Sequence, residues 1–205
     1  MQTLNELQLD ALGEIFNIGV GRAASSLSLI VNDAVQLTAP SVALVHRDQA
    51  SSILRGAELE QFSTVSQTFS GPFDAQAVLI FPESNALEIV RLMVGPHMSI
   101  EELSEFEQEA MCEIGNIILN ACMSSLADIF HISFDSTLPL HRFGSSENLA
   151  ILDGDADEQM MLLLQVDMVI SQQRIQGHIL FLLSVASMSS LLACLGRYLA
   201  EQGLS

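Results

Sequence analysis

The residue types best suited to chemistry occur in two matching patterns. Each pattern consists of an acidic residue, a glutamate four positions later, an asparagine three positions after that, and a proline 23 positions further on. A carboxylate and an amide at positions i and i+3 lie side by side on the surface of a helix. Such a pair offers a negative charge, hydrogen-bond acceptors and amide donors at one place, without a nucleophile. The members are Asp10, Glu14, Asn17 and Pro40, and Glu109, Glu113, Asn116 and Pro139.

A single pair of this kind is usually part of a solvated helix face. Three observations favour a functional interpretation here. The pattern occurs twice, and asparagine is a poor residue in the middle of a helix, so its placement calls for a reason. Glycines also lie close to both patterns, where they cost helix stability and suggest that another backbone approaches. They are Gly13, Gly19, Gly21 and Gly115.

The two patterns belong to an internal repeat. Residues 11–40 align with residues 110–139 at an offset of 99, and residues 79–95 resemble residues 180–196 at an offset of 101. We therefore expect one domain over residues 1–205, made of two half-repeats at about 4–99 and 102–201 that a pseudo-two-fold axis relates. The connection is expected at 94–100, and the shorter helix of each half is expected to end at Gly95 or Gly196.

The elements that carry the patterns follow from hydrophobic periodicity. Apolar residues spaced by three and four predict long amphipathic helices over 4–31 and about 102–130, with shorter helices near 83–93 and 187–201. Runs of strands with hairpin-length links favour an antiparallel sheet over parallel crossovers, so the expected fold class is α/β of the α+β type. The expected strands cover 35–37, 41–46, 60–70, 75–81, 131–136, 138–143, 159–168 and 174–183.

Composition excludes several classes of function. The chain has 205 residues, 49% of them hydrophobic, which is enough for a packed core. It carries 25 acidic residues against 7 basic ones, all arginine, and the net charge of −18 argues against binding nucleic acid or an anionic membrane surface. Three cysteines without a CxxC motif fit a reducing cytoplasm. The N-terminus lacks the pattern of a signal peptide, and residues 175–196 come closest to a membrane span but contain polar interruptions.

The sequences EIFNIGVGRAASSLS and EIGNIILNACMSSLA surround the two patterns. With them, nearly the whole chain resembles the CheC group of the CheC/CheX/FliY phosphatases of bacterial chemotaxis. The resemblance implies a single α/β unit with pseudo-two-fold symmetry, in which two long helices pack over a largely antiparallel sheet and expose the motif. It also implies removal of the phosphoryl group from the aspartate of phosphorylated CheY. By motif position, the catalytic residues would be Glu14, Asn17, Glu113 and Asn116, with Asp10 and Glu109 as partner-binding residues.

The chemistry that the resemblance implies needs little from this protein. The regulator supplies its own Mg²⁺, so the chain needs no metal or cofactor, and an amide on a rigid helix can position a water for in-line attack. A neighbouring glutamate can pair with a lysine of the regulator. There are departures from the family pattern: Glu109 stands where the family favours Asp or Ser, and Phe16 and Arg22 stand where smaller or neutral residues are expected.

The histidines, the cysteines and one acidic segment are expected to have structural or surface roles. The five histidines have no metal-binding spacing, and Cys112 and Cys122 are expected to be small buried residues. The acidic segment with Asp153, Asp155 and Asp157 begins like a calcium loop, but the EF-hand spacing is wrong, which favours a solvated loop.

A second class of function stays open. The same fold could serve as a non-catalytic adaptor that binds a response regulator, a CheD-like deamidase or a flagellar switch component. An adaptor has no chemical need for both a glutamate and an asparagine at both places, which favours the phosphatase.

Overall fold

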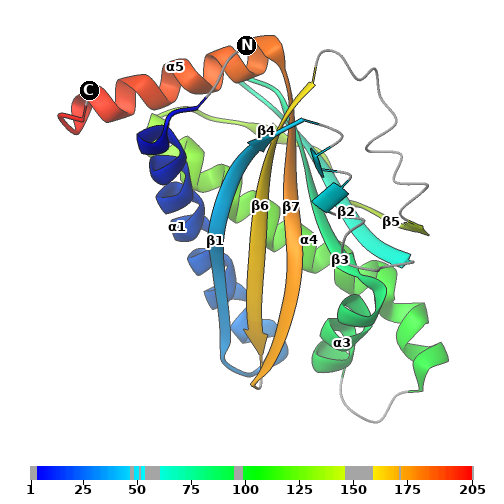
Figure 1. Ribbon diagram of the computed structural model, residues 1–205. Helices are drawn as coiled ribbons and strands as arrows, with labels where there is room; N and C mark the ends of the chain where they lie inside the picture. Colours follow the sequence, from blue (N-terminus) through cyan, green and yellow to red (C-terminus); the bar gives the residue numbers. More distant parts are fainter. Residues whose placement is uncertain are drawn as a thin grey trace.

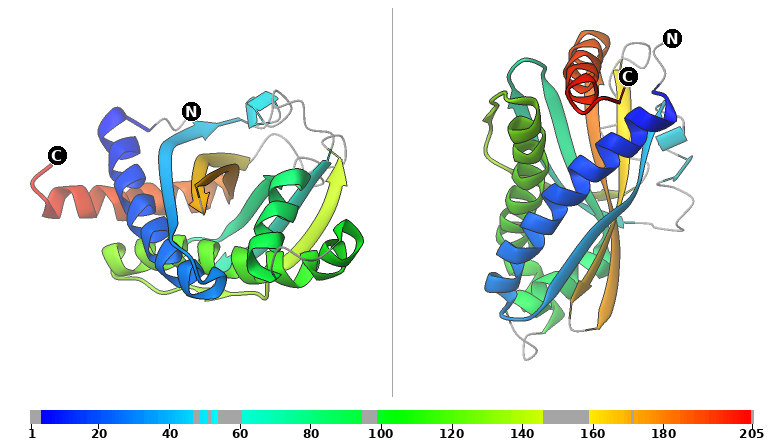
Figure 2. Two further views of the ribbon diagram at one scale, coloured as in Figure 1. Left: turned by 90° about the horizontal axis from the view of Figure 1, so that it is seen from below. Right: turned by 90° about the vertical axis from the view of Figure 1, so that its left-hand side faces the viewer.

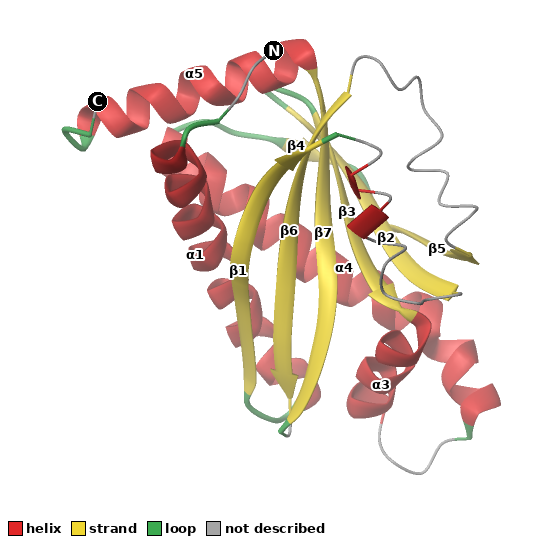
Figure 3. Cartoon of the chain, in the orientation of Figure 1, coloured by secondary structure: helices red, strands yellow, loops and turns green. Residues whose placement is uncertain are grey.

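Two long helices lie side by side on one face of a twisted antiparallel sheet (Figures 1 and 2). The computed structural model describes residues 4–46, 49–50, 52–53, 61–94, 99–145, 159–170 and 172–204. Its helices are α1 (Glu6–Val31), α3 (Glu83–Val94), α4 (Ile100–Phe130) and α5 (Val185–Glu201). Figure 3 shows these helices against the strands β1 (Val35–Val45), β2 (Gln61–Ser70), β3 (Ala75–Pro82), β4 (Asp135–Ser136), β5 (Leu140–Ser145), β6 (Gln159–Ile170) and β7 (Gln173–Ser184).

Both long helices have strong start and stop signals. Asn5 and Gln8 form a capping box at the start of α1, and Ser99 and Glu102 form one at the start of α4. Each helix ends at a residue in the left-handed conformation: Asn32 with φ 52° after α1, and His131 with φ 55° after α4. The two elements that carry the Glu–Asn patterns are therefore defined locally at both ends.

The sheet interleaves the two halves of the chain. Its order is β1-β6-β7-β3-β2-β4, and β5 also pairs with β2. The first strand of each half thus pairs with the second strand of the other half. These pairs are β1 with β6, and β4 together with β5 with β2. At the centre, Val78 pairs with Leu180 and Leu79 with Ile179. An offset of 101 relates Val78 to Ile179 and Leu79 to Leu180, so the predicted pseudo-two-fold operation would exchange these two pairs.

The ladder breaks at the same place in both halves. In β1, Thr38 pairs with Asp167 and Ser41 with Gln165, so Ala39 and Pro40 both lie opposite Val166. We predicted two short strands on either side of Pro40, whereas the structure has one strand with a bulge, because a proline without an N–H group interrupts the ladder without ending the strand. The equivalent break separates β4 from β5 around Leu138 and Pro139, opposite Gln67.

The core lies between the long helices and the sheet. Ala77, Leu79 and Phe81 of β3 face this core, while the alternate residues Val78 and Ile80 belong to a smaller cluster on the other face. The main core includes buried apolar residues from both long helices. Phe16 is completely buried and stacks on Phe181 at 5.1 Å between ring centroids, so its bulk serves the core.

Four glycines were expected to mark the close approach of another backbone, and of these only Gly19 does so. A Cβ on Gly19 would lie 2.8 Å from the Cα of Cys122 and 2.9 Å from the carbonyl oxygen of Ala121, so α1 and α4 cross there in backbone contact. At Gly115 the tight neighbour is the side chain of Val65, not a backbone. The interpretation is wrong for Gly13, whose nearest neighbour is a side chain at 3.9 Å, and for Gly21, which has none within 4 Å.

Two residues outside the core that the sequence singled out are Arg22 and Gly196. Arg22, an unusual residue in the family pattern, pairs with Asp128 at 2.6 Å and joins α1 to α4 on the surface. Gly196 is not a helix C-cap, because α5 continues through it to Glu201. Gly95, His97 and the acidic residues 153–157 lie outside the described residues.

The length and composition of α4 resemble those of a membrane-spanning helix. Residues 175–196 were expected to come closest to a membrane span, whereas the segment of this kind among the described residues is 106–130. Within the most apolar window of that segment, 56% is buried against the rest of the protein, which is how the core helix of a packed domain also behaves. The expected fold class, α/β of the α+β type with two long helices on a largely antiparallel sheet, is confirmed.

Candidate functional site

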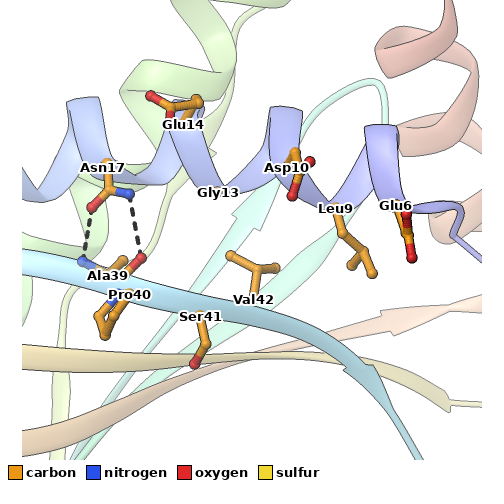
Figure 4. Close-up of a pocket in the computed structure, with 10 residues that line it drawn as sticks. All are labelled: Glu6, Leu9, Asp10, Gly13, Glu14, Asn17, Ala39, Pro40, Ser41 and Val42. Carbon is orange, nitrogen blue, oxygen red and sulfur yellow. Dashed lines mark hydrogen bonds between the residues drawn. The ribbon is translucent and has the colours of Figure 1, made fainter.

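The first Glu–Asn pattern lines a groove between α1 and the bulge of β1. Asp10 and Glu14 are exposed on the helix, and Asn17 is half-buried one turn further on. Figure 4 shows Asn17 facing the strand at Ala39, with Glu14 on the outer side of the same helix. The groove has a volume of about 680 Å³ and is lined by Glu6, Leu9, Asp10, Gly13, Glu14, Asn17, Ala39, Pro40, Ser41 and Val42.

Asn17 is bound to the backbone at the bulge. Its Oδ1 accepts from the N–H of Ala39 at 2.9 Å, and its Nδ2 donates to the carbonyl oxygen of Ala39 at 3.3 Å. Ala39 lies in the bulge, where the register between β1 and β6 is interrupted, and the amide bonds to its backbone groups there. The interaction fixes which side of the amide is oxygen, and it occupies one N–H of Asn17.

The second pattern lines the equivalent groove beside α4. Glu109 and Glu113 are exposed, and Asn116 is half-buried, as in the first half. Here the end of α3 adds Met93 and Val94 to the wall, so the lining of this groove is more apolar than that of the first. Its volume is about 740 Å³, and its lining is Met93, Val94, Phe106, Glu109, Ala110, Cys112, Glu113, Asn116, Leu138 and Pro139.

Asn116 makes different contacts from Asn17. Its Oδ1 accepts from the Nε2 of Gln67 at 3.1 Å and from the Nδ2 of Asn120 at 2.9 Å. Among the described residues, its Nδ2 has no hydrogen-bond partner. The repeat places Val166 at the position of Gln67 and Gly21 at that of Asn120, so the first half has no counterpart of this network.

Gln67 and Asn120 are not among the site residues predicted from the sequence. Gln67 is only 2% exposed, and its position in a strand gives no indication that an asparagine 49 residues away is its partner. A signal was present in the repeat, since a polar residue in one half stands where the other half has Val166. Asn120 also follows Asn116 at i+4, which places both amides on one helix face.

The structure brings each predicted site residue to one of these two grooves. Asp10, Glu14 and Asn17 line the first, and Glu109, Glu113 and Asn116 line the second. Within the described residues, no group of three or more His, Cys, Asp or Glu is arranged to hold a metal ion. In both grooves, exposed carboxylates lie beside a half-buried amide.

The cysteines do not all behave as predicted. Cys122 is buried, and burial raises the pKa of its thiol to about 12, so it is a neutral core residue as expected. For Cys112 the prediction of a buried residue is wrong, because it is half-buried and lines the second groove. It occupies the position that Gly13 has in the first groove.

Comparison with known proteins identifies relatives of this arrangement. Residues 7–44 match the CheC-like family, and this segment contains the whole first pattern through Pro40. CheY-P phosphatase CheC of Bacillus subtilis is 26% identical over 201 residues, covering 94% of this chain and 96% of that protein. The family resemblance is confirmed.

Two further comparisons involve FliY. Flagellar motor switch phosphatase FliY of Bacillus subtilis is 29% identical over 138 residues, which are 66% of this chain but 35% of that protein. The crystal structure of FliY from Thermotoga maritima matches 96% of this chain and 100% of that one, with a TM-score of 0.78 and 19% identity. Over that length the chain thus has the same fold as the FliY structure.

Proposed function

We propose that the protein accelerates dephosphorylation of the aspartyl phosphate of a CheY-type response regulator in the cytoplasm, as a hydrolase of chemotaxis signalling. The observation that carries the proposal is the repetition of one arrangement in two grooves. In each groove an exposed glutamate and a half-buried asparagine lie on a capped helix beside a strand break that contains a proline. The two relatives named as phosphatases support the same activity.

The proposed reaction needs a positioned water. Its oxygen forms a bond to phosphorus as the bond from phosphorus to the aspartate carboxylate oxygen breaks, which yields free aspartate and inorganic phosphate. An aspartyl phosphate is already reactive, and the regulator is proposed to bring the Mg²⁺ that neutralises the phosphoryl charge. The remaining task is to hold the water in line, and an amide on a rigid helix can do this by hydrogen bonding.

The glutamates are proposed to dock the partner. Glu14 and Glu113 are exposed one turn before the asparagines, so a cation of the regulator can reach them as the amide approaches the phosphoryl group. This chain contains no lysine, and its net charge is −18. A lysine at the contact must therefore come from the partner, and the acidic surface favours a basic face of that partner. Asp10 and Glu109 add charge one turn earlier.

The decisive test is the decay of a phosphorylated CheY-type regulator with and without the protein. We expect faster decay with wild type and the intrinsic rate with the Asn17→Ala, Asn116→Ala double variant, while circular dichroism shows that the fold is intact. Decay at one rate with the wild-type protein, with the double variant and with buffer would contradict the proposal. Binding of the regulator or of a CheD-like protein without acceleration would indicate the adaptor instead.

A further inference from the structure

We propose that Gln67 and Asn120 are positioning residues of the second groove, which hold the amide of Asn116 with its NH₂ group available to the partner. The inference rests on the proposed phosphatase function. It adds Gln67 of β2 and Asn120 of α4 to the predicted Glu–Asn pairs. It also implies that the two grooves differ in their chemistry.

Two backbone carbonyl groups determine the orientation of the amides. The Nε2 of Gln67 donates to the carbonyl oxygen of Thr137 at 3.0 Å, so this end of the Gln67 amide must be nitrogen. The Nδ2 of Asn120 donates to the carbonyl oxygen of Asn116 at 2.8 Å, so this end of the Asn120 amide is also nitrogen. A carbonyl oxygen cannot donate, so neither amide can be turned around.

The orientation of Asn116 follows from its two neighbours. The side-chain atom of Asn116 that lies 3.1 Å from Gln67 Nε2 and 2.9 Å from Asn120 Nδ2 must be an acceptor, because both of those atoms are donors. It is therefore Oδ1. Asn120 Nδ2 also lies 3.3 Å from the Oε1 of Gln67, which joins the three amides in one network.

The consequence is an amide whose oxygen accepts two hydrogen bonds. Neither N–H bond of Asn116 Nδ2 has a partner among the described residues, and Asn116 lines the groove beside Glu113. At the regulator they can meet two acceptors, the attacking water and a phosphoryl oxygen. A water that accepts from Nδ2 through one lone pair keeps the other for phosphorus, so the network favours in-line attack.

The first groove lacks this arrangement. Asn17 is held through both Oδ1 and Nδ2 by Ala39, so it presents one N–H at most without breaking a hydrogen bond. Val166 and Gly21 occupy the positions of Gln67 and Asn120 and offer no side-chain donors. Among the described residues, side chains orient the amide in the second groove alone: the buried Gln67 and the half-buried Asn120.

The test uses an Asn17→Ala background, so that only the second groove can act. Gln67→Met removes the donor at similar volume, and Asn120→Ala removes the second donor at a position where alanine favours the helix. We expect each to lower kcat for regulator dephosphorylation about tenfold with KM unchanged, because the docking carboxylates stay in place. Thr64→Val is the matched control. It removes another buried hydrogen bond from β2, which Thr64 donates to the carbonyl oxygen of Arg142 at 3.0 Å, and it should leave kcat unchanged.

The outcomes separate this inference from the proposed function. If the Asn17→Ala protein accelerates decay and Asn116→Ala abolishes that activity, but Gln67→Met and Asn120→Ala keep full kcat, the positioning role is wrong and the phosphatase stands. An equal loss of kcat in Thr64→Val would likewise overturn it, since general loosening of β2 would explain the effect. If the wild-type protein does not accelerate decay, the proposed function itself is wrong.

Discussion

The side chain of Asn17 binds both backbone groups of Ala39, 22 residues away in the sequence. This contact gives a physical reason for the spacing of the first pattern. Pro40 interrupts the ladder of β1, Ala39 lies in the resulting bulge, and a helical amide bonds to its N–H and C=O. The asparagine and the proline are therefore parts of one structural unit that opens the groove beside Glu14.

The two asparagines should contribute unequally to activity. We expect Asn116→Ala to remove most of the acceleration of regulator dephosphorylation, about tenfold, and Asn17→Ala to remove less than half. The reason is that Asn17 must break contacts with Ala39 to offer its amide fully, whereas Asn116 has a free Nδ2 among the described residues. Single-turnover decay of phosphorylated regulator measures this. Equal losses in the two variants would show that the contacts with Ala39 do not limit the first groove.

The sequence alone predicted much of the site, because its main signal is local. Glu14 and Asn17 lie one turn apart on one helix, and the repeat identified their equivalents Glu113 and Asn116. Gln67 could not be identified in this way. Its contact with Asn116 depends on which strand of the other half packs beneath α4, and periodicity carries no information on that pairing.

The helices and strands were predicted well, whereas some of their ends and the pairing of the strands were predicted less well. Helices with capping boxes were located within a few residues, since their signals are local. Gly196 failed as a helix end, because packing of α5 residues beyond it, such as the buried Leu199, continues the helix. The first strand of each half pairs with a strand of the other half. This pairing depends on the whole sheet and cannot be predicted from any one segment.

The crossing of α1 and α4 should be sensitive at Gly19 and insensitive at Gly21. Gly19→Ala would place a Cβ 2.8 Å from the Cα of Cys122, and such overpacking costs about 1–3 kcal/mol of unfolding free energy. Gly21→Ala meets nothing within 4 Å, and the better helix propensity of alanine should stabilise the protein by up to about 1 kcal/mol. Urea denaturation of both variants is the measurement. A stable Gly19→Ala protein would show that the helices can separate at little cost.

Stability should fall as the pH decreases below about 6.5, partly because of His141. Burial lowers the pKa of His141, although the charge of Glu107 opposes this effect; Ser63 Oγ lies 2.7 Å from its Nε2. The unfolded chain then binds a proton at a higher pH than the native state, so stability is present above the ordinary pKa of 6.5 and lost as the pH decreases. His178 behaves alike, since burial also lowers its pKa.

The contribution of His141 is separated by comparing two variants. His141→Gln should flatten the dependence of unfolding free energy on pH between 7.5 and 5.5, and His46→Gln, at an exposed position, should leave it unchanged. Chemical denaturation at each pH measures the slope. An identical slope in His141→Gln and wild type would assign the whole effect to other groups.

Cys112 offers a direct report on docking at the second groove. It is half-buried in the groove lining, whereas Cys122 and Cys194 are buried, so a maleimide should modify Cys112 first in the native protein. A CheY-type regulator activated with beryllofluoride and Mg²⁺ should slow that modification, because the docked partner covers the groove. Glu113→Arg should abolish the protection by reversing the charge at this contact, and Glu14→Arg, in the other groove, should preserve it. Protection that survives Glu113→Arg but is lost in Glu14→Arg would place the docked regulator at the first groove instead.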